Sequence, residues 1–265
     1  MTEFSNPQAY ERWMGRWSAR LAPLFVRFAG PGSPGRYLDV GAGTGVLARA
    51  IAGEIDDAEV VGIEPAVSYV DHARARLRDS RLRFEVGDAQ AIPFNDDSFD
   101  AALALLLLQE VPDAPMAVDE MRRVTRPGGC LAATQWDFRR GMPMLSLFWE
   151  AAQEVVPGER TRREAAQRVS PGYSDEGALA RLWEQAGLAR VETAGLEIAM
   201  DFASFDDYWS PFLGGATPTS SYAATLPDDV RQTLAARLRE KVLGDGPDRP
   251  FSLSARAWAV RGIVP

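Results

Sequence analysis

The chain has 265 residues, of which 46% are hydrophobic and 25% charged, and its formal net charge at pH 7 is -8. This composition is typical of one soluble globular core with room for a small appendage. The excess of 37 Asp and Glu over 29 Lys and Arg removes the positive field that attracts nucleic acid phosphates or anionic lipid, so neither partner is expected.

Cysteine and histidine are too scarce for several kinds of chemistry. The single cysteine, Cys130, cannot form an internal disulfide or, alone, a thiolate metal site. The single histidine, His72, lies in a charged stretch, which argues against His-centred triads and multi-His metal sites. The N-terminus has no apolar leader, and the longest apolar run, residues 101–108, is too short to span a bilayer. We therefore expect a cytoplasmic protein without a metal, and the sequence leaves its oligomeric state open.

Strand and helix patterns alternate through the first half of the chain. A Gly/Pro cluster at 30–35 separates an N-terminal helical segment from this region. Apolar patterning then predicts strands at 37–40, 59–63, 82–86, 99–107 and 130–135, with helices at 45–52, 67–77 and 116–124. The run at 99–107 could be a helix on hydrophobicity alone, but its place in the alternation favours a central buried strand. The whole pattern predicts a mostly parallel sheet covered on both faces.

The alternation breaks after Trp136. Two polar, helix-like stretches, 144–166 and 205–243, are interrupted by a predicted helix at 175–186 and a strand around 190–200, and residues 251–260 alternate as a last strand. We expect the two stretches to pack together over one edge of the sheet and to recognise the substrate. The predicted divisions are a helical lid (1–30), a cofactor-binding core (31–137) and a remainder (138–265) with cap insertions at about 138–173 and 203–249.

A glycine-rich turn follows the first predicted strand, which runs into Asp39-Val-Gly41-Ala-Gly43-Thr-Gly45 and then a helix. Glycine lets the backbone turn sharply and lets a ligand approach the main chain. Because open parallel sheets bind ligands beyond the carboxyl ends of their strands, this turn predicts a cofactor site. The dinucleotide fingerprint G-x-G-x-x-G would need a glycine at Val46, so the match to a nicotinamide site fails there.

Acidic residues follow the next two strands. Glu64 closes the second strand, where a carboxylate can accept hydrogen bonds from both hydroxyls of a ribose, a feature shared by NAD and S-adenosylmethionine sites. Asp88, between Gly87 and Ala89 after the third strand, could accept from an adenine amino group. Together with the glycine turn, these carboxylates favour a nucleotide cofactor.

Four segments, LDVGAGTG, GIEP, VGDAQAIPFNDDSFD and EMRRVTRPGG, occur in an order and spacing that resemble the class I S-adenosylmethionine-dependent methyltransferases. The resemblance is to the group similar to ubiquinone/menaquinone biosynthesis methyltransferases, and it covers residues 36–137. It implies an α/β fold: a seven-stranded, mostly parallel, doubly wound Rossmann-like sheet with an antiparallel last strand. The insertions described above add the expected helical cap. It also implies S-adenosyl-L-methionine as cofactor, S-adenosyl-L-homocysteine as product and a small-molecule acceptor.

The resemblance assigns cofactor contacts by position. It implies that the methionine part is held by Asp39, Gly41, Ala42 and Gly43. It implies that Glu64 binds the ribose and that the sulfonium region faces Leu105. The residues implied at the adenine are Pro65, Tyr69, Asp88 and Ala89.

The N-terminal segment carries Tyr10, Met14 and Arg16 close together. In similar methyltransferases this segment folds over the cofactor, which implies that Arg16 pairs with the cofactor's carboxylate, because a guanidinium suits a planar anion. The alternative is an amphipathic helix that packs its aromatic residues on the sheet.

Methyl transfer from a sulfonium is a direct displacement, so the protein mainly has to position the nucleophile and exclude water. The candidates near the methyl group follow the fourth and fifth strands: Gln109, Glu110, Trp136 and Asp137. Glu110 or Asp137 could act as a base, Gln109 could orient the nucleophile and Trp136 could wall the pocket. Each could instead be a strand-end residue with local contacts.

The insertions contain an aromatic set: Phe148, Trp149, Phe202, Phe205, Tyr208, Trp209 and Phe212. If these residues line a pocket, the acceptor is a small, largely apolar or aromatic molecule. Alternatively, they form the core of the insertions. Two other functions stay open at this point: a nicotinamide-dependent oxidoreductase, and a non-catalytic cofactor-binding or interaction module on the same fold.

Overall fold

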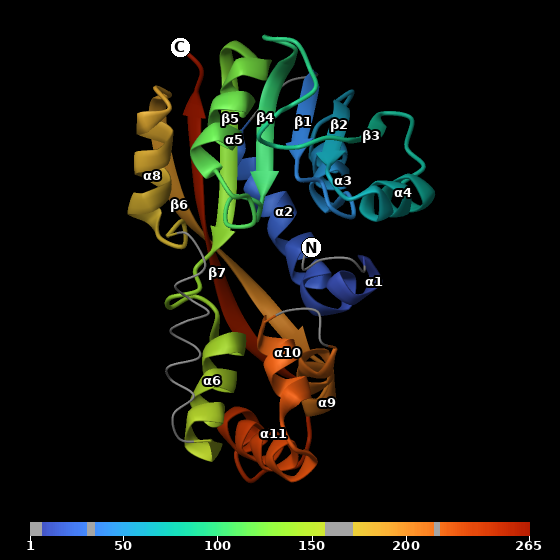
Figure 1. Ribbon diagram of the computed structural model, residues 1–265, viewed down its shortest axis with the longest axis vertical. Helices are drawn as coiled ribbons and strands as arrows, with labels where there is room; N and C mark the ends of the chain where they lie inside the picture. Colours follow the sequence, from blue (N-terminus) through green and yellow to red (C-terminus); the bar gives the residue numbers. More distant parts are fainter. Residues whose placement is uncertain (1–6, 31–34, 157–171, 215–217) are drawn as a thin grey trace.

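The computed structural model describes residues 7–30, 35–156, 172–214 and 218–265. Its centre is a seven-stranded sheet with the order β3-β2-β1-β4-β5-β7-β6 (Figure 1). The strands are β1 (Arg36–Val40), β2 (Glu59–Glu64), β3 (Leu82–Val86), β4 (Phe99–Leu105), β5 (Thr125–Trp136), β6 (Ala189–Phe202) and β7 (Phe251–Ile263). β1 to β5 pair in parallel, and β7 runs antiparallel to both β5 and β6. This confirms the expected fold class, including the antiparallel last strand.

Helices cover both faces of the sheet. The helical elements are α1 (Pro7–Tyr10), the π-helix η1 (Glu11–Gly15), α2 (Arg16–Ala29), α3 (Val46–Glu54), α4 (Val67–Arg76), α5 (Ala114–Val124), α6 (Pro143–Val155), α8 (Glu176–Gln185), α9 (Phe205–Trp209), the 3₁₀-helix η2 (Ser210–Leu213), α10 (Pro218–Thr225) and α11 (Asp228–Leu243). One apolar cluster joins the sheet to α2, α3 and α4, and another joins it to α5 and α8. Because β4 lies between these clusters, residues 101–104 are completely buried, which confirms it as a central strand.

The two insertions form a second lobe. β6 and β7 extend beyond the other strands, and α6, α9, α10 and α11 gather around this extension, beyond the carboxyl ends of β4 and β5 (Figure 1). Lys241 of α11 pairs with Glu154 of α6 at 2.8 Å, which joins the two insertions. The insertions therefore pack together as expected, but on a long two-stranded ribbon rather than over one edge of the sheet.

Several boundaries differ from the sequence-based expectation. β4 ends at Leu105 instead of 107, because Leu106 has a left-handed backbone with φ 61°. β5 begins at Thr125 instead of 130, so it is longer at its start than the apolar pattern predicts. α5 begins at Ala114, because the carboxylate of Asp113 accepts from the N–H of Met116. Of the helix expected at 144–166, α6 reaches Val155, and positions from 157 lie outside the described residues.

Candidate functional site

The glycine turn joins β1 to α3 at the carboxyl edge of the sheet. Gly41, Gly43 and Gly45 all have positive φ, of 71°, 53° and 81°. A Cβ at Gly41 would lie 2.5 Å from Leu107, and one at Gly45 would lie 2.5 Å from Leu77, so packing explains both glycines. At Gly43 a Cβ would have no neighbour within 4 Å. Gly43 is therefore the position where a ligand can approach the main chain.

Asp39 lies beneath this turn and is 1% exposed. Its Oδ2 accepts a hydrogen bond from the N–H of Ala48 at 2.9 Å, whereas its Oδ1 is buried without a hydrogen-bond partner among the described residues. Burial raises the pKa of Asp39 to about 7, the Ala48 N–H opposes this increase, and the charge of Glu64 adds to it. A cationic group next to this carboxylate would favour its ionised form.

Glu64, the last residue of β2, is hydrogen-bonded to the turn. Its Oε2 accepts from the N–H of Gly43 at 3.2 Å, and its Oε1 accepts from the N–H of Ala66 at 3.1 Å. Burial raises the pKa of Glu64, while these two N–H groups oppose the increase. The N–H of Ala42 also donates to the carbonyl of Ile63 at 2.8 Å. The end of β2 is thus hydrogen-bonded to the turn that follows β1.

The other expected cofactor residues lie at neighbouring strand ends. Pro65 follows β2 and is exposed, and Tyr69 is buried in α4. Asp88 is also exposed after β3, where it accepts from the N–H of Gln90 at 2.8 Å, and Ala89 beside it is buried. Leu105, half-buried, ends β4. Since β1 to β4 are parallel, all these residues lie at the same edge as the glycine turn.

The N-terminal segment makes different contacts from those expected. Arg16 Nη1 lies 2.7 Å from Asp207 Oδ1 in α9, and its Nη2 donates to the Asp207 carbonyl at 3.2 Å. Arg16 therefore joins the N-terminal helix to the cap, and its pairing with a cofactor carboxylate stays a prediction. Met14 is buried in the apolar cluster of the cap, and the side chain of Tyr10 lies outside the described residues. These contacts favour the packing alternative for this segment.

The candidates after β4 and β5 have distinct surroundings. Asp137 receives two hydrogen bonds from Arg256, at 3.0 and 2.6 Å, and the N–H groups of Arg139 and Arg140 donate to its other oxygen. Desolvation alone would raise the pKa of Asp137, but Arg256 and these N–H groups outweigh it and lower the pKa. A carboxylate held in this way is a poor proton acceptor, so the structure does not support Asp137 as a base.

The other three candidates differ from one another in exposure. Trp136 is 2% exposed and packs in the apolar cluster of the cap. Gln109 is half-buried, and its Oε1 is buried without a hydrogen-bond partner in the described part of the chain. Glu110 is exposed.

The aromatic set of the insertions mostly packs on itself. Six of the seven side chains are buried, and Phe205 is half-buried. Phe148 and Phe212 stack with ring centroids 4.6 Å apart, and the Tyr208 hydroxyl donates to the carbonyl of Met144 at 2.7 Å. These residues form the core of the cap, as the second interpretation expected, rather than an open pocket lining.

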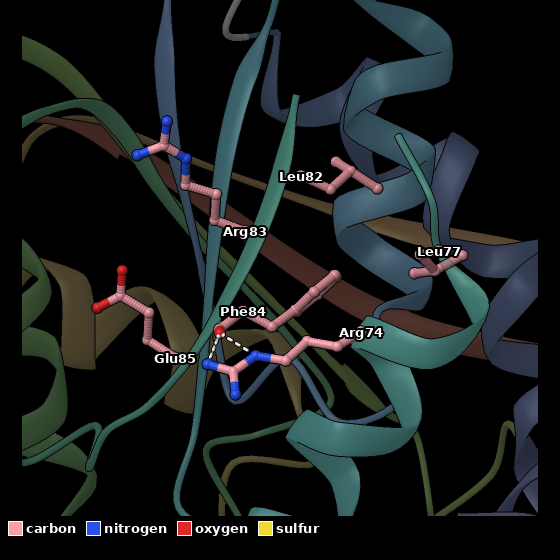
Figure 2. A pocket seen from close by; sticks show the side chains of 6 residues that line it. All are labelled: Arg74, Leu77, Leu82, Arg83, Phe84 and Glu85. Carbon is pink, nitrogen blue, oxygen red and sulfur yellow. Dashed lines mark hydrogen bonds between the residues drawn. The ribbon is translucent and has the colours of Figure 1, made fainter. Parts of the chain in front are cut away.

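A hollow of about 370 Å³ lies beside β3 at the free edge of the sheet (Figure 2). Its lining residues are Arg74, Leu77, Leu82, Arg83, Phe84 and Glu85. Arg74 donates to the Phe84 carbonyl from Nε at 2.9 Å and from Nη2 at 2.6 Å. The Phe84 ring would lie 2.8 Å from a Cβ at Gly45 and 2.7 Å from one at Gly62. Phe84 thus fills the space behind the glycine turn, a support that the sequence analysis missed.

In the described ranges, no group of three or more His, Cys, Asp or Glu side chains is arranged to hold a metal ion. None of the helices in the same ranges is long and apolar enough to cross a membrane.

Comparisons with known proteins place this geometry in context. A family model described as a methyltransferase domain matches residues 38–133. The chain is 36% identical to a demethylmenaquinone methyltransferase of Roseiflexus castenholzii over 133 residues, which cover 50% of this chain and 56% of that protein. It is 30% identical to a demethylmenaquinone methyltransferase of Clavibacter sepedonicus over 183 residues, which cover 64% of this chain and 74% of that protein. The match thus spans about half the length of the first of these relatives.

A solved structure with a similar fold is that of phosphoethanolamine N-methyltransferase 2 of Haemonchus contortus in complex with S-adenosyl-L-methionine. The two have a TM-score of 0.61 and 18% identity, with 98% of this chain and 56% of that chain covered. At this identity the likeness concerns the fold alone.

Proposed function

This chain belongs to the class I S-adenosylmethionine-dependent methyltransferases, and we propose that it transfers a methyl group from S-adenosylmethionine to a small-molecule acceptor. The observation that carries the proposal is the turn at Gly43, where the backbone is left-handed and the space beside the main chain is open. The relatives named above are methyltransferases, which disfavours the nicotinamide alternative.

The residues at the turn fit this cofactor. The buried, unpartnered Oδ1 of Asp39 suits the ammonium of the methionine part, and Gly41, Ala42 and Gly43 would supply the adjacent backbone. Glu64 is fixed at the end of β2, where its carboxylate can accept from ribose hydroxyls.

We assign the remaining subsites by the strand ends. Leu105 would border the sulfonium. The adenine would lie among Pro65, Tyr69, Asp88 and Ala89, which combine buried apolar surface with one exposed carboxylate. A stacking surface with a hydrogen-bond acceptor at its edge suits a purine that carries an amino group.

The bound cofactor supplies a methyl group on a positively charged sulfur. The chain's own contribution is to align the acceptor with that methyl group and to exclude water, which together can supply about 7–11 kcal/mol of the barrier reduction. Gln109 can orient the acceptor through its unpartnered carboxamide oxygen, and Trp136 can border the acceptor pocket. With Asp137 paired to Arg256, Glu110 is the remaining candidate base among the four.

We propose that the N-terminal segment (1–30) and the two insertions (138–173 and 203–249) act together as lid and cap. Trp13 and Trp17 share one apolar cluster with α6, η2 and α11, and the same cluster contacts Leu105 at the end of β4. This cluster joins the lid to the cap, and the apolar side chain of Leu105 at its border, beside the proposed sulfonium region, supports a small and largely apolar or aromatic acceptor.

The test is an acceptor screen with purified protein and S-adenosylmethionine. Small phenols, quinols and amines are incubated singly, and S-adenosylhomocysteine formation is measured together with the mass gain of one methyl group in the acceptor. Acceptor-dependent formation of both products supports the proposal. If the protein binds the cofactor but methylates nothing in a broad panel, the non-catalytic module is favoured.

A further inference from the structure

Gln135 is a polar side chain in the otherwise apolar end of β5. It is completely buried. In the carboxamide orientation that satisfies its surroundings, the side-chain oxygen lies 3.2 Å from the backbone nitrogen of Leu107 and 2.5 Å from that of Leu108. Both N–H groups belong to the turn that follows β4, so one oxygen accepts from two successive residues of that turn.

The turn has a backbone that needs such support. Leu106 has a φ of 61°, which a leucine rarely adopts unless its surroundings hold it there. The N–H of Leu106 donates to the carbonyl of Thr134 at 2.8 Å. Thr134 and Gln135, two successive residues of β5, therefore bind three successive N–H groups of the turn. Since buried N–H groups are rarely left without an acceptor, removing the Gln135 oxygen should displace the turn.

The same turn lies against the glycine loop of the proposed cofactor site. The Cδ1 of Leu107 lies 2.5 Å from the position of a Cβ at Gly41, so this side chain touches the glycine directly. Gln109 follows two residues later. A displaced turn would therefore shift Leu107 against Gly41, and would shift Gln109 with it.

We propose that Gln135 is a positioning residue for the methionine half of the cofactor. Its oxygen holds the turn at 106–109, and the side chain of Leu107 in that turn sets the position of the backbone at Gly41. Gln135 acts through Leu107 and does not itself contact the cofactor. This inference rests on the proposed function, because it is the assignment of Gly41 to the methionine part that gives the turn its role.

The test compares two variants by calorimetric titration with S-adenosylhomocysteine and with 5′-methylthioadenosine. The second compound has the adenine and ribose but lacks the methionine ammonium and carboxylate. Gln135→Met keeps the side-chain length but removes the hydrogen-bond acceptor. It should weaken S-adenosylhomocysteine binding about tenfold and change 5′-methylthioadenosine binding by less than about twofold. Gln135→Glu keeps an oxygen acceptor and should restore binding of S-adenosylhomocysteine. Hydrogen exchange at Leu107 and Leu108 should be faster in the Met variant only.

Unchanged S-adenosylhomocysteine affinity in Gln135→Met, or an equal loss for both nucleosides, would overturn the positioning role. If Gln135→Met does not fold, Leu107→Ala takes its place, because it removes the contact with Gly41 and should show the same selective loss. An equal loss for both nucleosides in that variant also overturns the proposal. Failure of the wild-type protein to bind S-adenosylhomocysteine would instead contradict the proposed function.

Discussion

The buried carboxyl of Asp39 should make the cofactor-free protein less stable as the pH rises. Its pKa is raised from 3.8 to about 7, mainly by burial. A pKa difference of one unit corresponds to about 1.36 kcal/mol, so ionised Asp39 costs the folded state about 4 kcal/mol relative to the unfolded chain. The pKa of Asp39 is higher in the folded protein than in the unfolded chain. The contribution of protonated Asp39 to the free energy of unfolding is therefore fully present below about pH 4 and is lost as the pH rises to about 7.

Asp39→Asn removes this ionisation and keeps an oxygen for the Ala48 N–H. In urea unfolding at about pH 8, the free energy of unfolding of the variant should exceed that of the wild type by up to about 4 kcal/mol. This difference in the free energy of unfolding should shrink toward zero near pH 4. The matched control is Asp119→Asn, which makes the same chemical change at an exposed position of α5. An Asp39→Asn variant that is less stable than the wild type at about pH 8, or a difference that does not change with pH, would refute the reasoning.

The same substitution should weaken cofactor binding, so stability and function oppose each other at this position. An ammonium next to Asp39 favours its ionised form, and the wild type must release a proton to bind at low pH. Its affinity for S-adenosylhomocysteine should therefore rise between about pH 6 and pH 8. The Asp39→Asn variant should bind more weakly, with an affinity that changes little over this range. If the affinity for S-adenosylhomocysteine changed with pH in the same way in the wild type and in Asp39→Asn, the proton released on binding would come from another group.

Three further predictions concern single residues. Gly43→Val should abolish calorimetric binding of S-adenosylhomocysteine, since a branched side chain is strained at a φ of 53° and fills the open space beside the turn, and unchanged affinity would contradict this. Glu64→Ala should weaken the same binding by about 1–3 kcal/mol through the loss of hydrogen bonds to a carboxylate, and no loss would count against the ribose assignment. Asp137→Asn should lower the free energy of unfolding by about 2–3 kcal/mol. This is less than the loss expected for a fully buried pair, because the side chain of Arg256 is one-third exposed. An unaffected urea midpoint would show that the pair contributes little.

The fold and the cofactor turn could be predicted because their signals are local. The glycine turn and Glu64 each follow directly from a recognisable strand, and parallel strands bring such ends to one edge. The ring of Phe84 behind the turn has no such signal, since one aromatic residue in a short strand is ordinary.

Contacts between residues far apart in the sequence could not be predicted. Arg16 and Asp207 meet because β6 carries α9 toward the N-terminal helix, and neither residue's neighbours indicate the other. Asp137 and Arg256 meet because β5 and β7 pair in one particular register. Gln135 did carry a signal, because an uncharged polar side chain in a buried strand needs a hydrogen-bond partner, but only the path of the β4 turn identifies that partner.

The central claim, that this chain binds a sulfur nucleotide at the Gly43 turn, is tested most directly by titration calorimetry of the purified protein. S-adenosylmethionine, S-adenosylhomocysteine and NADH are titrated separately under the same conditions. The account predicts binding of the first two and no binding of NADH. Binding of NADH alone, or of none of the three, would contradict it.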